Sequence, residues 1–339
     1  MKQLITELSA IPGVSGRESE VREFIISKIK DVSEYSVDAL GNLLVMKKGK
    51  RRPSHKVMLA AHMDEVGLII SYITEDGFLK FAPVGRVLPR VLMGRPVLVG
   101  SNAVPGAIGV KPVHLLKEDE KKALPETDSL YIDIGAFSRE EARGLVKPGD
   151  TAVFCSNPVS FGDGFMKGRA LDDRVGCAVL VEMIRGDLEF DTWFAFTVQE
   201  EVGLRGAKTA AFQINPDYAI VVETTTAADI PGVNDEKRVC LLGEGPAVSF
   251  MDRSTTYDHR LYQTVMETAA AKGIKAQPKT VVAGGNDAGV IHTSRAGVRT
   301  LTVSVPCRYL HSASCVIKES DAAETAKLVK ALATQFADA

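Results

Sequence analysis

The sequence predicts an α/β fold that is interrupted by a small β-rich insert. From about residue 163 the chain alternates between strand-like apolar runs and helical segments, which is typical of a sheet with helices on both faces. Between about residues 70 and 162 the pattern changes to short β-rich runs separated by turn signals such as Asp76-Gly77. A length of 339 residues agrees with one larger and one smaller domain. We therefore expect residues 1–69 and 163–339 to form one domain and residues 70–162 another.

The N-terminal part predicts a helix followed by a buried strand. Ser15 and Glu18 have capping-box spacing, which predicts a helix start. The apolar residues that follow recur at helical intervals, namely Val21, Phe24, Ile25 and Ile29. Residues 56–61 then form an apolar run, which predicts a buried strand.

The insert contains six strand-like runs, at residues 68–73, 78–81, 96–99, 107–110, 130–134 and 151–154. The charged stretch 117–122 is predicted to be a solvated loop or helix face. Short strands separated by turns predict a small β-barrel or sandwich.

The remaining chain supplies the alternating elements of the larger domain. Helices are predicted over residues 175–184 and 206–212, around residues 261–269 and from Asp321 toward the C-terminus. Strands are predicted over residues 192–198, 218–222 and 298–305. This alternation places several strand ends along one edge of the sheet.

Composition excludes several classes of protein. The net charge of -2 and the pI near 6.3 give no support for nucleic-acid binding. No apolar run approaches the length needed to cross a bilayer, and the N-terminus lacks a signal-peptide core. The five cysteines are odd in number and form no Cys-x-x-Cys pair, which argues against a disulfide framework. We therefore expect a cytoplasmic protein without nucleic-acid or membrane partners.

Acids and histidines follow several predicted strands. The adjacent Glu200 and Glu201 point in opposite directions on an extended chain, so they can take separate roles. Asp64 lies two residues after His62, a spacing that suits a carboxylate orienting a metal-bound imidazole. In open α/β sheets, ligands bind outside the carboxyl ends of the strands. The residues expected at this edge are His62, Asp172, Glu200, Glu201, Glu223 and His311.

Each of these signals also has an ordinary structural interpretation. An isolated Glu-Glu pair is usually solvated, and Asp173 beside Asp172 can simply cap a helix. Taken together, however, two histidines and three carboxylates suit two adjacent divalent ions, with one carboxylate bridging. Glu200 would then be available for proton transfer.

The chain resembles the M42 metallo-aminopeptidases, which are co-catalytic two-metal exopeptidases. The matching segments occur in family order and span nearly the whole chain: AAHMDEVG (60–67), KGRALDDRVG (167–176), TVQEEVGLRGA (197–207), VVETTTAADIPG (221–232), GGNDAGVIHTSRAGV (284–298) and PCRYLHS (306–312).

The resemblance implies a role for each residue of the set. One ion, Zn²⁺, Co²⁺ or Mn²⁺, would be held by His62, Asp172 and Glu223, and a second by Asp172, Glu201 and His311. Glu200 corresponds to the general base and Asp64 to the carboxylate that orients His62. The family often has Asp at the position of Glu223. The longer Glu side chain can still bind a metal, but it would change the ligation geometry and the metal preference.

The resemblance also implies a fold and partners. The catalytic domain would have a mixed sheet, and the insert would be a PDZ-like dimerisation domain. Dimers would build a homo-oligomer such as a tetrahedral dodecamer, and the substrates would be short peptides with a free N-terminus.

Three alternatives remain open at this point. A glycoside hydrolase would use Glu200 and Glu201 as its carboxylates but gives no role to the histidines. A related two-metal carboxypeptidase or deacylase would share the ligands. A scaffold with an inert peptidase domain is disfavoured, because every ligand position is filled. The preferred N-terminal residue is also undecided, since an acidic preference would need a basic residue in the pocket.

Overall fold

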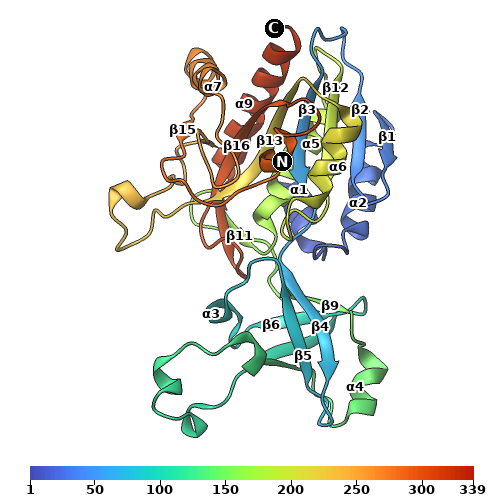
Figure 1. The fold of residues 1–339 in the computed structure, drawn as a ribbon, viewed down its shortest axis with the longest axis vertical. Helices are drawn as coiled ribbons and strands as arrows, with labels where there is room; N and C mark the ends of the chain where they lie inside the picture. The colour runs from blue at the N-terminus through green and yellow to red at the C-terminus, as the bar shows by residue number, and fades with distance from the viewer.

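The computed structural model describes all 339 residues and shows a larger α/β body joined to a β-barrel (Figure 1). The body is built on an eight-stranded sheet in the order β1-β2-β12-β3-β13-β16-β14-β15. Strands β12, β3, β13 and β16 are mutually parallel, whereas β1, β2 and β14 pair antiparallel with their neighbours toward β12 and β16. The strands are β1 (Glu34–Val37), β2 (Leu43–Lys47), β3 (Val57–His62), β12 (Thr192–Thr197), β13 (Tyr218–Thr226), β14 (Ala247–Val248), β15 (Gln277–Pro278) and β16 (Arg299–Cys307).

Helices pack on the sheet in two groups. Helix α5 (Leu171–Arg185) contacts β3 and β13, α9 (Glu319–Ala337) contacts β16, and α1 (Lys2–Ala10) and α2 (Ser19–Ile29) pack against α5. In the second group, α6 (Arg205–Ile214) contacts β12 and α8 (Ala288–Ile291) contacts β13 and β16. Helix α7 (His259–Ala271) extends the first group, because it lies against α9, and it also contacts β14. Every residue of β3 is buried, because a parallel strand covered on both faces needs apolar side chains in both directions. A core cluster of 60 buried residues results.

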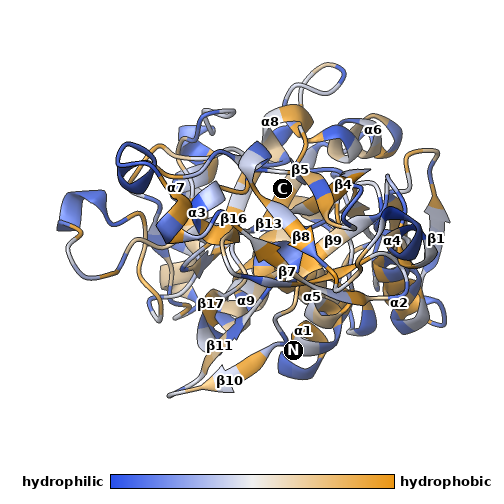
Figure 2. Ribbon diagram, turned by 90° about the horizontal axis from the view of Figure 1, so that it is seen from below, coloured by the Kyte–Doolittle hydropathy of each residue, from blue (hydrophilic) through white to orange (hydrophobic).

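The insert forms a closed barrel of strands in the order β4-β5-β8-β7-β6-β9. These are β4 (Gly67–Ile73), β5 (Leu79–Val84), β6 (Pro96–Val99), β7 (Val104–Gly109), β8 (Tyr131–Asp133) and β9 (Thr151–Phe154). The barrel has its own cluster of 19 buried residues. Its additional helices are α3 (Pro89–Leu92), α4 (Arg139–Leu145), η1 (Val113–Leu115), η2 (Glu120–Lys122) and η3 (Thr127–Ser129), and α4 is strongly hydrophilic in Figure 2.

The remaining elements lie outside both the eight-stranded sheet and the barrel. A three-stranded sheet is formed by β10 (Val159–Phe161), β11 (Phe165–Gly168) and β17 (Cys315–Lys318), and η4 (Asp235–Lys237) lies in the loop after β13. None of the helices is both long enough and apolar enough to span a membrane.

The predicted fold class, an α/β body with a mixed sheet and an inserted small barrel, is confirmed. All six strand-like runs of the insert correspond to barrel strands. One strand was predicted too short: β13 continues to Thr226, because the residues beyond position 222 still pair with β16.

The predicted capping box at Ser15 and Glu18 was wrong. Helix α2 begins at Ser19 and has no side-chain cap at its N-cap residue, Glu18. The Ser15 hydroxyl instead donates to the Asp64 carboxylate at 2.6 Å, and Glu18 accepts from the Gln199 backbone N–H at 3.1 Å. Both side chains are therefore used to hold loops at the edge of the sheet.

Candidate active site

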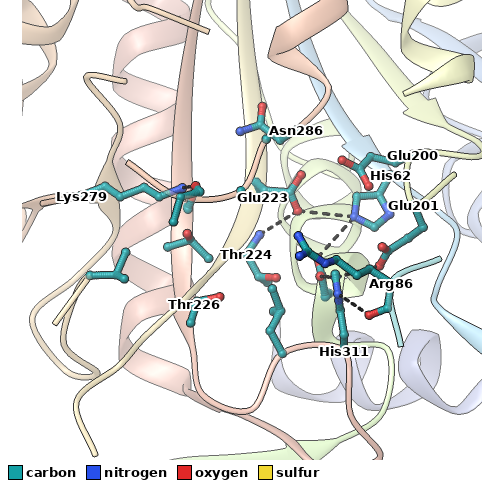
Figure 3. Close-up of a pocket in the computed structure, with 18 of the residues that line it drawn as sticks. His62, Arg86, Glu200, Glu201, Glu223, Thr224, Thr226, Lys279, Asn286 and His311 are labelled. Atoms are coloured by element: carbon teal, nitrogen blue, oxygen red, sulfur yellow. Dashed lines mark hydrogen bonds and ion pairs between the residues drawn. The ribbon is translucent and has the colours of Figure 1, made fainter. Parts of the chain in front are cut away.

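The predicted residues converge at the carboxyl edge of the parallel strands. His62 ends β3, Glu223 lies in β13, Glu201 follows β12 and His311 follows β16. Asp172 is at the start of α5, beside these strand ends. The six residues His62, Asp172, Glu200, Glu201, Glu223 and His311 line one cavity of about 360 Å³ (Figure 3). The prediction that these six residues lie together at one edge of the sheet is therefore confirmed. Their chemical roles remain predictions.

His62 presents one ring nitrogen to the cavity. Its Nε2 lies 3.3 Å from Asp172 Oδ1 and 3.4 Å from Glu223 Oε1. Its Nδ1 lies 3.1 Å from the Asp64 carbonyl oxygen and 3.4 Å from Asp64 Oδ1. With Nδ1 as the donor to Asp64, Nε2 carries the free lone pair that a metal requires.

His311 faces the opposite oxygen of the same aspartate. Its Nε2 lies 3.3 Å from Asp172 Oδ2 and 3.3 Å from Glu201 Oε1. Its Nδ1 lies 3.2 Å from the backbone oxygen of Arg86, which follows barrel strand β5. The two carboxylate oxygens of Asp172 thus face two different histidines, an arrangement that suits a bridging ligand.

Asp64 organises the acidic pair as well as His62. Its two oxygens accept the backbone N–H groups of Glu200 at 3.0 Å and Glu201 at 3.1 Å. The preceding residue, Gln199, has a left-handed φ of 56°, which turns the chain as it leaves β12. Left-handed backbone at a non-glycine residue is costly and is typical of functional sites. The turn at Gln199 and the hydrogen bonds to Asp64 together fix the backbone position of Glu200 and Glu201.

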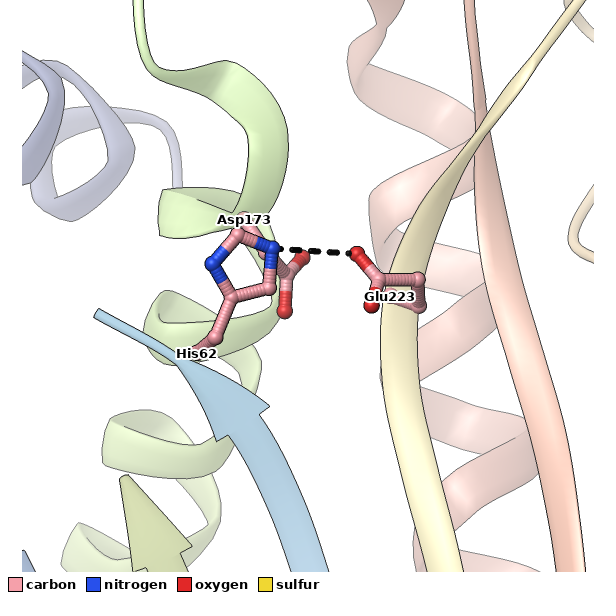
Figure 4. Close-up of side chains that lie close together, drawn as sticks. All are labelled: His62, Asp173 and Glu223. Carbon is pink, nitrogen blue, oxygen red and sulfur yellow. Dashed lines mark ion pairs between the residues drawn. The ribbon is translucent and has the colours of Figure 1, made fainter. Parts of the chain in front are cut away.

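Asp173 combines the predicted capping contact with a position at the site. Its Oδ1 accepts the Gly176 N–H at 3.0 Å, whereas its Oδ2 is buried without a hydrogen-bond partner. Ligand atoms of Asp173, His62 and Glu223 lie within 4.8 Å of one another, and Figure 4 shows the Asp173 carboxylate next to the His62 ring, with Glu223 facing the same ring. A second such group consists of His62, Asp172 and Glu201. The structure therefore brings both adjacent aspartates to the site.

The cluster has more carboxylates than the two imidazoles can neutralise. Burial raises the pKa of Glu223 to about 8 and raises the pKa of Glu200 well above its ordinary range. Burial by itself would lower the pKa of His311, but the carboxylates of Asp172 and Glu201 outweigh it and raise that pKa to about 11. The only polar partner of the buried Glu201 Oε1 is His311, whose Nε2 lies 3.3 Å away, and Asp173 Oδ2 has no hydrogen-bond partner at all. An excess of buried acid of this kind fits a site for cations.

Several residues of the site were not found from the sequence. The buried Asp287 accepts a 2.6 Å hydrogen bond from the Thr197 hydroxyl, and burial raises its pKa to about 6. Arg86, Lys279 and Asn286 also line the cavity. Gly284 and Gly285 line the cavity as well, and a Cβ at Gly285 would approach Ser254 Oγ to 2.8 Å. This close approach of the loop backbone to Ser254 is visible only in the structure.

The α/β body, the inserted barrel and the buried histidine–carboxylate cluster together define a peptidase. The family model for M42 glutamyl aminopeptidases matches residues 41–328, and the chain belongs to the M42 peptidase family. It is accordingly a peptide-bond hydrolase of the aminopeptidase type.

Curated relatives match over nearly their full length. A protein of Acetivibrio thermocellus, provisionally named an aminopeptidase, is 42% identical over 97% of both chains. The lysyl aminopeptidase of Pyrococcus furiosus is 35% identical and is covered over 96% of its length, against 97% of this chain. The glutamyl aminopeptidase of Lactococcus lactis is 30% identical, with 98% of this chain and 95% of that protein covered. These names differ in the residue removed.

Solved structures show the same architecture. The TET aminopeptidase of a marine sediment thaumarchaeon superposes with a TM-score of 0.94 at 36% identity, over 98% of this chain and 96% of that one. The TET1 peptidase of Pyrococcus horikoshii, which can assemble into a tetrahedron or an octahedral shell, has a TM-score of 0.87 at 39% identity, with 98% of both chains covered. A structure from Thermotoga maritima named an endoglucanase has a TM-score of 0.81 at 38% identity, over 98% of this chain and 97% of that one.

Proposed function

We propose that the protein is a two-metal aminopeptidase that removes N-terminal residues from short peptides. His62, Asp172 and Glu223 would hold one divalent ion, and Asp172, Glu201 and His311 the other. The observation that carries this proposal is the Asp172 carboxylate, whose two oxygens each lie 3.3 Å from a different histidine. Imidazole and carboxylate donors suit Zn²⁺, Co²⁺ and Mn²⁺.

The ions and the protein side chains would divide the chemistry. When bound, two divalent ions supply Lewis acidity that polarises a carbonyl and lowers the pKa of water to about 7. The Glu200 carboxylate, which is not one of the proposed ligands, would take the proton from the attacking water and pass it to the departing amine. Burial raises the pKa of Glu200 above its ordinary value, and a more basic carboxylate is a better acceptor for the proton of a water molecule.

The cavity would select the end of a peptide. Its volume of about 360 Å³ lies at the lower end of the range for small-molecule sites, so it holds a terminal residue rather than a folded segment. The acidic groups around His62 favour a positively charged substrate group, such as the free α-amine.

The barrel would serve assembly, and residues 70–162 would be a PDZ-like domain of its own. Its loops expose large apolar side chains, including Val113 at 70% and Phe137 at 90% of their accessible surface. We expect dimers that build a larger homo-oligomer in the cytoplasm. Analytical ultracentrifugation of the full chain tests this: a monomer at micromolar concentration would contradict it.

The decisive test of the mechanism is Glu200→Gln, with Glu201→Gln as the matched control. Loss of the general base should lower kcat by about 10²- to 10⁴-fold while the metal content stays unchanged. The control should lose metal, because Glu201 is a proposed ligand. Retained peptidase activity in Glu200→Gln would show that another group moves the proton.

Two alternative activities are separated by substrate. The structural neighbour named an endoglucanase makes a cello-oligosaccharide assay necessary, and a two-carboxylate glycosidase would resist chelators. A carboxypeptidase or deacylase would accept a peptide with a blocked N-terminus, which an aminopeptidase should refuse.

A further inference from the structure

The chain segment that joins α1 to α2, residues 11–18, runs beside the loops that carry the proposed metal ligands. Val14 in this N-terminal connection forms a parallel bridge with Glu65, in the loop after β3. The connection precedes all the residues that the family model matches. We propose that the N-terminal connection is a positioning element of the metal centre, held in place by a buried cluster of Glu65, Arg169 and Arg174. This inference rests on the proposed two-metal function.

Two polar side chains of the N-terminal connection reach the loops of the site. The Ser15 hydroxyl donates to Asp64 Oδ2 at 2.6 Å, and Glu18 accepts the Gln199 backbone N–H at 3.1 Å. Asp64 lies beside the His62 ring, and Gln199 immediately precedes the acidic pair. The connection therefore holds both the loop after β3 and the loop after β12.

Arg174 ties helix α1 to the loop after β3. Its side chain is fully buried, and its Nε donates at 2.8 Å to the carbonyl of Met63, directly after His62. Its Nη1 donates to the carbonyls of Leu8 at 2.5 Å and Ile11 at 2.9 Å. These carbonyls lie at the C-terminal end of α1, a position that favours a cation. One guanidinium group therefore fixes the end of α1 relative to the end of β3.

Glu65 and Arg169 form a second buried link to the same part of the chain. Glu65 Oε1 forms an ion pair with Arg169 and accepts the Gly13 N–H at 3.0 Å. The Glu65 N–H in turn donates to the Gly13 carbonyl at 2.9 Å. Arg169 also donates to the Ala10 carbonyl at 2.8 Å, and both charged side chains are buried. The N-terminal connection is thus fastened through its backbone as well as through Ser15 and Glu18.

The place of the two arginines in the chain connects the cluster to the proposed bridging ligand. Arg169 lies three residues before Asp172, and Arg174 lies two residues after it. The desolvation of buried charges offsets much of their attraction, so a cluster of this kind contributes little net stability. Its contribution is a fixed geometry, because both ends of the segment that carries Asp172 are attached to the N-terminal part of the chain.

The first test is hydrogen–deuterium exchange of the full chain with and without Co²⁺. Coupling between two sites is reciprocal, so metal binding should slow exchange of the backbone amides of residues 11–18 by at least about fivefold. Helix α4 of the barrel is the internal control and should exchange at the same rate in both states. Unchanged exchange at residues 11–18 in the wild-type protein with Co²⁺ bound would overturn the inference without any variant.

The second test is Arg169→Met, with Arg51→Met as the matched control, because the exposed Arg51 pairs with Glu189 in the same domain. Arg169→Met should lower the affinity for Co²⁺ by about 10- to 100-fold, the usual effect of changing a group behind the ligands. Excess Co²⁺ should restore kcat with KM unchanged, and Arg169→Lys should recover part of the affinity. The control should bind Co²⁺ as the wild type does. Wild-type affinity in Arg169→Met would contradict the positioning role.

A third variant covers the case in which Arg169→Met does not fold. Gly13→Ala disturbs the cluster from the N-terminal side, since a Cβ there would lie 2.6 Å from Arg174 Nη2. It should show the same loss of Co²⁺ affinity, whereas Gly144→Ala, whose Cβ would meet nothing within 4 Å, should show none. Normal cleavage of peptides without the exchange effect would refute this inference alone. The exchange effect without cleavage of any N-terminally free peptide would refute the aminopeptidase activity alone.

Discussion

The two sides of the cavity carry opposite charge imbalances. The histidine side, formed by His62, Asp172, Glu201, Glu223 and His311, has more acid than base, and Oδ2 of the adjacent Asp173 is buried without a hydrogen-bond partner. The lysine side, formed by Lys279 with Thr224, Thr226 and Ser304, has a buried cation that makes no hydrogen bond to a carboxylate, although Asp252 and Glu223 attract it. An imbalance in a buried site is unfavourable unless a bound group neutralises it. Under the proposed function, the first side would be completed by divalent cations.

The two sides are also built differently. The histidine side stands on the ends of central parallel strands, where β3, β12 and β13 are hydrogen-bonded on both edges. The lysine side depends on β15, a two-residue strand at the edge of the sheet. We expect changes on the histidine side to abolish activity and changes on the lysine side to alter selectivity.

The largest expected effect is that of Asp172→Ala. Because Asp172 faces both histidines, its loss should weaken both ions and lower kcat by more than roughly 10³-fold. Elemental analysis after dialysis should show less metal per chain. Asp229→Asn, a carboxylate outside the cavity lining, is the control and should retain metal; equal metal in Asp172→Ala and wild type would contradict the bridging role.

A smaller effect is expected when Asp64, which contacts His62 and the backbone of Glu200, is changed. Asp64→Asn should reduce metal affinity by about 10- to 100-fold, because the Asp64 carboxylate lies 3.4 Å from His62 Nδ1 and accepts the Glu200 N–H. Competition with a chromogenic chelator measures this. Ser15→Ala, which removes one hydrogen bond to Asp64, should weaken binding less. If either variant changed the Glu to Leu preference, the two sides would not be independent.

On the lysine side, Thr224→Val is expected to act on substrate binding. The Thr224 hydroxyl is available to the substrate, because it has no hydrogen-bond partner in the protein. Removing it should raise KM for p-nitroanilide substrates by roughly 3- to 10-fold, the usual effect of losing one hydrogen bond. Metal content should not change. A loss of metal would mean that Thr224 acts through the neighbouring Glu223, whose Oε1 accepts the Thr224 N–H at 3.0 Å.

The smallest expected effect concerns Asp229, the partner of Arg308. Burial would raise the pKa of Asp229, but the Arg308 guanidinium and the Leu242 N–H outweigh it and hold the pKa below its ordinary value. A lowered folded-state pKa stabilises the protein above the ordinary value of about 3.9, and this contribution is lost as pH falls through the folded pKa. Asp229→Asn should therefore be less stable at pH 6, by no more than about 1 kcal/mol for a partly exposed pair. Thermal melts should show the difference from wild type disappearing in acid; a constant difference would exclude the charge as its cause.

Sequence reasoning was most successful where parallel strands end. His62, Glu201 and His311 could be chosen because each follows an apolar run, and parallel strands bring their carboxyl ends to one edge. It failed at Ser15 and Glu18, because three-residue spacing describes both a capping box and a loop that reaches into a site. For Asp173, the sequence predicted the capping contact but not the place at the site. The second role depends on the position of its Oδ2 beside His62 and Glu223, which only the structure shows.

The sequence by itself determined the α/β body, the six-stranded insert and the residues of the histidine side. These follow from the local hydrophobic periodicity and from the rule that ligands bind at the carboxyl ends of parallel strands. Both can be applied to the sequence alone. Only the tertiary structure decided that Lys279 enters the same cavity from the edge of the sheet and makes no hydrogen bond to a carboxylate there. Lysines are numerous in the chain, and burial without a partner is a relation between distant segments that no local pattern encodes.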